Sequence, residues 1–194
     1  MKFTKILGVV AVAALALMAF ASTASATTLE TKGVAVNSAE TIEATLASGA
    51  SALLTDTNNV SANTCTSSTV KGTTAKDSSG DFTGPVVEGP ISTLTWSNCT
   101  QGNPTAELNG TLSVENISGT TNGTVRSNGA KVKVPSFFGT LTCTTSNTDI
   151  GKLNGVKEGN ATFTINAVLT CTVIGSAKWS GTYTITTANL GVSA

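Results

Sequence analysis

The sequence contains no histidine, and charged and aromatic side chains are few. Its 194 residues include 11 basic and 11 acidic side chains, with two Trp, one Tyr and six Phe. Without histidine, the chain lacks the usual general base at neutral pH and the commonest metal ligand. So few Lys and Arg create no basic field for nucleic acid. We therefore expect no cofactor, no metal site and no nucleic-acid partner.

Small polar residues are abundant instead, with 36 Thr, 20 Ser and 15 Asn. Hydrophobic residues nevertheless make up 40% of the chain, which is too many for a disordered protein. The composition therefore predicts a folded protein with an apolar core.

The first 26 residues have the pattern of a secretory signal peptide. A short basic start precedes an uncharged run from Ile6 to Phe20, and Ala24-Ser25-Ala26 supplies the small residues that a signal peptidase reads. The apolar run is shorter than the roughly 20 residues of a membrane-spanning helix, although a retained anchor is the alternative. We predict a signal peptide at 1–26 and a single secreted or cell-surface domain at 27–194 with no membrane span.

The four cysteines agree with export. An even set in an exported chain predicts two disulfides, and we favour pairing neighbours in sequence: Cys65 with Cys99 and Cys143 with Cys171. Cys143 and Cys171 both fall on the apolar side of alternating segments, which supports their pairing. A zinc site built from all four is the alternative, but its ligands usually come in close pairs, and here every gap is at least 28 residues.

Apolar and polar residues alternate along much of the chain, most clearly in 162–172 and 178–186. This period of two is typical of strands with one buried face, and Thr suits the solvent face because its branched side chain favours extended backbone. The expected strands are 29–36, 41–54, 65–73, 91–98, 107–116, 124–126, 131–134, 137–144, 162–172 and 178–186.

About ten strands without a helix predict an all-β fold, an antiparallel β-sandwich that can take the jelly-roll form. Residues 74–90 are rich in Gly, Pro, Ser and Asp, and we expect a loop there. Asn128-Gly129 is the strongest turn signal, and it predicts a hairpin between the strands on either side.

Two residue pairs carry catalytic patterns. Ser68 and Lys71 match the S-x-x-K motif of serine acyl enzymes, but that chemistry needs a helix, and positions three apart in a strand point to opposite faces. Asp77 and Asp81 have the spacing of a calcium or glycosidase pair, although a solvated turn is the simpler interpretation. We therefore expect a protein that is not an enzyme.

A few aromatic residues are candidates for ligand contact. Trp179 and Tyr183 have the spacing of a sugar-stacking face, but they share the phase of Ile185, which favours core packing. Trp96 and Phe138 are the remaining candidate ligand-contact residues, because either could present a ring to solvent.

Four segments carry a resemblance to known proteins: Asn63–Thr66, Gly89–Cys99, Gly139–Cys143 and Ser176–Tyr183. Together they resemble a group of small secreted bacterial proteins of unassigned function, over most of the mature chain. More distantly, the Thr- and Gly-rich composition and the Cys-bearing strands are similar to bacterial activators of alkane oxidation. That resemblance implies surface association and a link to hydrophobic substrates, and it assigns no functional residue.

Two functions are therefore expected. The first is a non-catalytic secreted or cell-surface protein with a structural or interaction role, whose partners would be components of the cell envelope or extracellular matrix. The second is an extracellular binding module for a carbohydrate or a hydrophobic compound.

Overall fold

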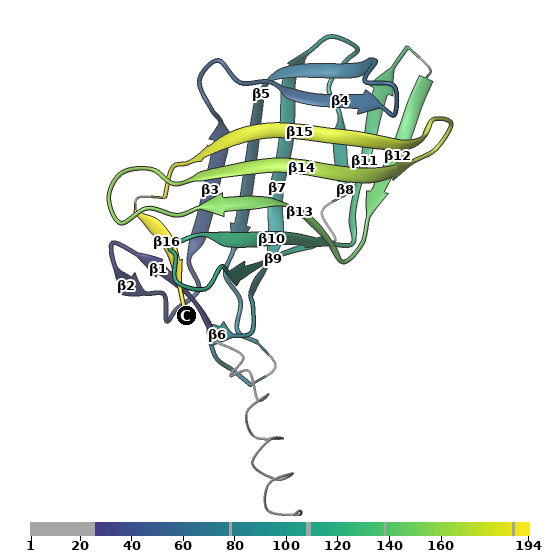
Figure 1. Cartoon of the computed structure of the whole chain (residues 1–194). Coiled ribbons are helices and arrows are strands. Elements are labelled where there is room, and N and C mark those ends of the chain that lie inside the picture. Colours follow the sequence, from purple (N-terminus) through teal and green to yellow (C-terminus); the bar gives the residue numbers. More distant parts are fainter. Residues whose placement is uncertain (1–25, 78, 108–109, 138, 188) are drawn as a thin grey trace, which may run out of the picture.

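The computed structural model describes residues 26–77, 79–107, 110–137, 139–187 and 189–194 (Figure 1). Residues 1–25 of the expected signal peptide lie outside this range. The described residues form sixteen β-strands and no helix, so the all-β class is confirmed. Within the same ranges, no helix is long and apolar enough to cross a membrane.

Eight strands of the main sheet close on themselves. The closed order is β5–β7–β9–β10–β13–β14–β15–β3 and back to β5, with all neighbours antiparallel. The strands are β3 (Thr41–Leu46), β5 (Ser61–Thr73), β7 (Val87–Cys99), β9 (Thr111–Asn116), β10 (Gly123–Asn128), β13 (Thr148–Asn154), β14 (Thr162–Cys171) and β15 (Gly175–Ile185).

Four further strands pair with the far ends of the longest strands and close a second ring. They are β4 (Ala52–Asp56), β8 (Thr105–Glu107), β11 (Ala130–Ser136) and β12 (Gly139–Thr145). β4 lies between β5 and β15, and β8, β11 and β12 connect β7 to β14. The barrel thus has a lower half, with β3, β9, β10 and β13, and an upper half, with β4, β8, β11 and β12. Both halves share β5, β7, β14 and β15 (Figure 1).

A small sheet lies at the end of the lower half, beside the C-terminus (Figure 1). It consists of β1 (Thr27–Thr31), β2 (Val34–Ala35), β16 (Leu190–Ser193) and the two-residue β6 (Thr83–Gly84), with β1 pairing the other three. Leu29, Leu190 and Val192 are buried in the core. The small sheet therefore contributes apolar side chains to the lower end of the barrel.

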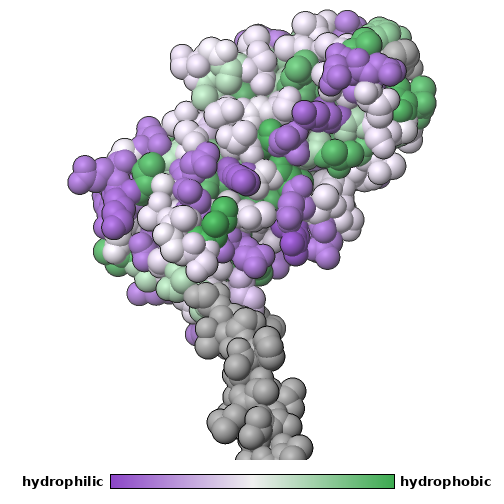
Figure 2. All heavy atoms as spheres, viewed as in Figure 1, coloured by the Kyte–Doolittle hydropathy of each residue, from purple (hydrophilic) through white to green (hydrophobic). Residues whose placement is uncertain are grey.

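The alternating pattern of β14 places its apolar residues inside, as the sequence predicts. Phe163, Ile165 and Leu169 are buried, whereas Thr164 and Thr170 in the opposite phase are exposed. Figure 2 shows the resulting outer face of β13, β14 and β15, where hydrophilic and near-neutral residues predominate and hydrophobic ones are scattered. The Thr surplus therefore covers the solvent side of the barrel in these strands.

The expected sandwich of two packed sheets is replaced by a closed barrel. Closure depends on the pairing of β3 with β15, which joins segments near opposite ends of the described chain. The described strands also exceed the expected ten. Some expected strands are divided, and β6, β13 (Thr148–Asn154) and β16 lie where no strand was expected. The divided segment 41–54, for example, is two strands joined by a turn in which Gly49 has a φ of 74°. The expected loop at 74–90 is wrong in part, because it contains β6 and the first residues of β7, which begins at Val87.

The expected hairpin at Asn128-Gly129 is wrong. β10 pairs with β9 and β13, whereas β11 pairs with β8 and β12, so the two strands flanking Gly129 do not pair with each other. Gly129 has a φ of 74°, a conformation that glycine adopts without strain. The turn therefore carries the chain from the lower half of the barrel into the upper half.

Both expected disulfides are confirmed: Cys65 is bonded to Cys99 and Cys143 to Cys171. Each joins residues directly opposite in neighbouring strands of the upper half, β5 with β7 and β12 with β14. No cysteine of the described residues is free. Two disulfides indicate an oxidising environment such as the cell exterior.

Candidate functional site

The lower half of the barrel contains a cavity of about 120 Å³. Each strand of the lower ring contributes to its wall, and Leu29 and Leu190 of the small sheet contribute to its end. The side chains that form the wall include Val70, Val125, Leu153, Phe163 and Ile185.

The strand pattern explains why the wall is apolar. Val70, Val125 and Phe163 are buried, and each occupies the inward phase of its strand. On β3, the inward phase includes Ile42 and Ala44, and the small methyl group of Ala44 leaves space that a larger side chain would fill. Hydrocarbon side chains therefore surround the space.

Glu88 is the one ionisable residue among the lining residues that the structure describes. It lies between the buried Val87 and Ile91 in the outward phase of β7, where it is exposed and accepts a hydrogen bond from the Thr111 hydroxyl. Thr74 also borders the cavity, and its hydroxyl contacts the backbone of Ser38 and Glu40. Its polar group is thus already engaged at the edge of the cavity.

The two sides of the cavity differ in exposure. Ile42 of β3 and Leu112 and Val114 of β9 line it but are only partly buried. Leu153 and Phe163 on the opposite side are 2% and 6% exposed. Solvent therefore reaches the wall formed by β3 and β9, and the opposite wall is closed.

A polar cluster of Tyr183, Ser68 and Trp96 lies inside the barrel between its two halves. The Tyr183 hydroxyl is 3.1 Å from that of Ser68, and all three residues are buried. Burial raises the pKa of Tyr183 to about 12, although hydrogen bonds with Ser68 and Trp96 oppose the rise. Tyr183 is therefore a neutral structural group at physiological pH, and none of the three residues lines the lower cavity.

The upper half is filled more tightly. Its cavity measures about 30 Å³ and is bordered by Trp96 and Trp179, whose ring centres are 5.5 Å apart. Asn63, also on this cavity, donates to the backbone oxygens of Gly102 and Pro135. Trp96 is 7% exposed and so offers no face to a ligand in solvent. The other candidate, Phe138, lies outside the described residues.

The structure separates Ser68 from Lys71. The Ser68 hydroxyl points into the barrel toward Tyr183, whereas the Lys71 ammonium pairs with Glu43 at 3.0 Å on the partly exposed outer side. Positions three apart in β5 thus point to opposite faces, as the strand pattern predicts, and the S-x-x-K arrangement is not formed.

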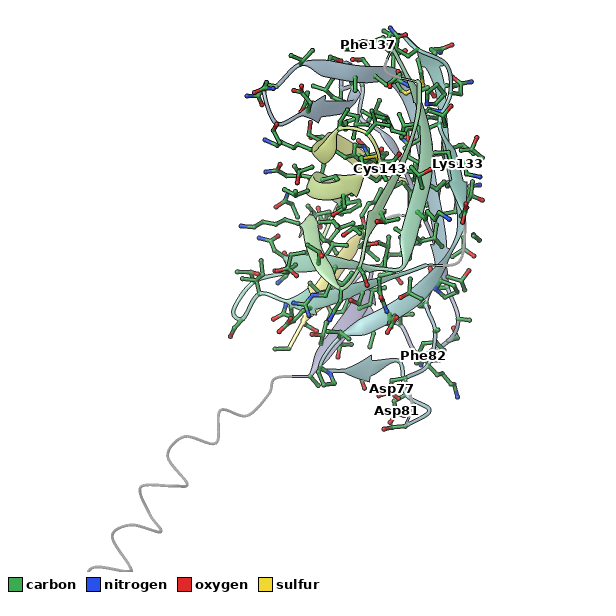
Figure 3. The ribbon with its side chains drawn as sticks, turned by 90° about the vertical axis from the view of Figure 1, so that its right-hand side faces the viewer. Asp77, Asp81, Phe82, Lys133, Phe137 and Cys143 are labelled. Atoms are coloured by element: carbon green, nitrogen blue, oxygen red, sulfur yellow. A yellow bond between two sulfur atoms is a disulfide. The ribbon has the colours of Figure 1, made fainter. Side chains whose placement is uncertain are left out.

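Asp77 and Asp81 lie in the loop below the barrel, next to Phe82 (Figure 3). The Asp77 carboxylate accepts hydrogen bonds from the backbone amides of Ser79 and Asp81, which makes the segment a turn closed by its own side chain. The described residues contain no group of three or more potential metal ligands. This geometry agrees with the solvated turn expected from the sequence.

The residues of the lower cavity were not singled out by sequence analysis. They are the same Val, Leu, Ile and Phe types that fill any strand-rich core, so no local pattern distinguishes them. The cavity arises from closure of the ring around small inward groups such as Ala44 and Gly72.

No protein family, curated protein or solved structure matches this chain. The two resemblances noted in the sequence therefore stay expectations, and the function must be argued from the cavity itself.

Proposed function

We propose that this protein is an exported, non-catalytic binding protein that holds a small hydrophobic compound in the lower half of its barrel. The observation that carries the proposal is the apolar cavity of about 120 Å³. Of the functions expected from the sequence, binding of a hydrophobic compound is the one that this site supports best.

The cavity has a size and chemistry suited to a small apolar molecule. An apolar cavity of about 150 Å³ engineered into another protein stays free of water and binds benzene or xenon. Burying a seven-carbon compound such as toluene contributes about 5.6 kcal/mol, at about 0.8 kcal/mol for each carbon. That free energy corresponds to a Kd of about 0.08 mM, before the cost of immobilising the ligand.

Export is part of the proposal. It is supported by the signal-like segment at 1–26 and by the two disulfides. Carbohydrate binding gains no support from Trp96, whose indole is buried in the upper half. A purely structural role at the cell surface is the alternative that a failure of binding would favour.

The test measures toluene binding to residues 27–194, the segment that contains all sixteen described strands. In methyl NMR spectra, toluene should shift the signals of Val70, Val125 and Leu153 in the cavity wall. Ala44→Leu places three more carbons in the space and should abolish those shifts. Thr45→Leu, the next position on β3 in the outward phase, is the matched control and should bind like the wild type.

Binding that is equally strong in the wild type and Ala44→Leu would place the toluene elsewhere and contradict the proposal. The absence of any shift in the wild type would contradict it as well.

A further inference from the structure

We infer that the ligand of the lower cavity is an unfunctionalised hydrocarbon, a compound without a hydrogen-bonding group. This inference rests on the proposed function and narrows its ligand class. It follows from the small number of hydrogen-bond donors and acceptors that the wall and its surroundings present to a ligand.

Apart from Thr73, Thr74 and Glu88, the wall consists of apolar residues, and the Thr74 hydroxyl is already bonded to the backbone of Ser38 and Glu40. Val70, Val125, Leu153, Phe163 and Ile185 end in methyl groups or a phenyl ring. The backbone groups behind them are committed to the strand pairings of the closed ring. A hydroxyl or carbonyl buried against the closed side of the cavity, away from the partly exposed residues of β3 and β9, would therefore lose its hydrogen bonds with water and gain none.

The other polar groups in or near the lower half of the barrel do not change this conclusion. The hydroxyls of Tyr183 and Ser68 bond to each other, and neither residue lines the cavity. The Glu88 carboxylate is exposed and bonded to Thr111 on the outer side of the barrel. Neither cluster is placed to accept or donate a hydrogen bond inside the lower half.

The free-energy cost of burying a hydroxyl without a hydrogen-bond partner determines how strongly the cavity should prefer toluene to phenol. Moving such a group from water into an apolar site without a partner costs about 2 to 7 kcal/mol. Toluene and phenol have nearly the same size and differ in a methyl and a hydroxyl group. The lower end of that range corresponds to a preference for toluene of about 30-fold.

A single substitution can supply the missing partner. Val125 is 4% exposed and lines the lower cavity, so Val125→Thr puts a hydroxyl on the wall at almost constant volume. Val132 is 6% exposed and borders the small upper cavity. Val132→Thr is thus a matched control, with the same chemical change at similar burial in the other half of the barrel.

The experiment compares the Kd values of toluene and phenol by methyl NMR titration of residues 27–194. We expect a preference for toluene of about 30-fold or more in the wild type and in Val132→Thr, and a preference reduced at least about fivefold in Val125→Thr. If Val125→Thr does not fold, Val70→Thr on β5, which also lines the lower cavity, replaces it.

The outcomes separate the inference from the proposed function. A wild-type preference below 30-fold, or an unchanged preference in Val125→Thr, would overturn the hydrocarbon class while toluene binding still supported the proposed function. Failure of toluene to bind the wild type would overturn both.

Discussion

The Tyr183 hydroxyl lies 3.1 Å from the Ser68 hydroxyl, and this bond joins β15 to β5 across the interior of the barrel. Both side chains are buried, and β5 and β15 are two of the four strands shared by the two halves. The pair therefore fixes a polar contact in the core, between the two cavities.

Tyr183→Phe should lower the free energy of unfolding by about 1 to 3 kcal/mol, because it leaves the Ser68 hydroxyl buried without its partner. Urea unfolding measures the change. The double variant Tyr183→Phe with Ser68→Ala removes both polar groups and should recover part of the loss. An equal or larger loss in the double variant would show that the bond is not the source of the effect.

Alkaline pH should destabilise the protein through the same tyrosine. The folded state raises the pKa of Tyr183 from 10.0 to about 12, so the folded protein keeps a proton that the unfolded chain releases. The stabilisation that this pKa difference contributes is fully present below pH 10 and is lost as the pH rises from 10 to about 12.

Tyr183 is the one tyrosine of the chain, so ultraviolet absorbance of tyrosinate reports its titration directly. The expected midpoint lies near 12 in the folded protein and near 10 in urea. A folded midpoint near 10 would show that the hydroxyl is accessible to water and would contradict its placement in the core.

Removal of the Cys143–Cys171 disulfide should cost about 3 kcal/mol of stability. The bond closes a segment with a sequence separation of 28, and closing a loop of this length restricts the unfolded chain. Replacing both cysteines with Ala avoids a free thiol, and urea unfolding reads the loss. A change below about 1 kcal/mol would argue against a stabilising role for this bond.

Val173 offers a test of backbone strain in the turn between β14 and β15. Its φ is 70°, a region that β-branched residues rarely adopt, and its side chain is 77% exposed. Val173→Asn should raise the free energy of unfolding by about 1 kcal/mol, because Asn tolerates this conformation.

The control for this substitution is Val168→Asn, on the same hairpin. Val168 is 63% exposed but lies within β14 without a positive φ. Asn is a poorer strand residue than Val, so this control should not gain stability. A gain of the same size in both variants would show that the effect comes from replacing an exposed apolar side chain with a polar one, and not from relief of backbone strain.

The main strands, their buried faces and the disulfides were predictable from the sequence, and the strand pairings that close the barrel were not. The alternation around Phe163 and Tyr183 predicted their strands and buried faces, and the shared phase of Cys143 and Cys171 predicted their bond. A period of two is the same in a sandwich and in a barrel, so it could not predict that β3 pairs with β15.

The turn at Asn128-Gly129 shows the same limit. The dipeptide correctly marks a glycine with positive φ, but the partners of β10 and β11 are set by strands elsewhere in the chain. The candidate site could not be predicted from the sequence for a related reason. Ala44 and Phe163 carry no functional signature, and only ring closure brings them around one space.

The most direct test of the proposed site is a crystal structure of residues 27–194 soaked in toluene. The account predicts electron density for one toluene ring in the lower half, in van der Waals contact with Val125 and Phe163 and without a hydrogen bond to the protein. Ordered water in that space, or toluene bound elsewhere with the lower half empty, would contradict it.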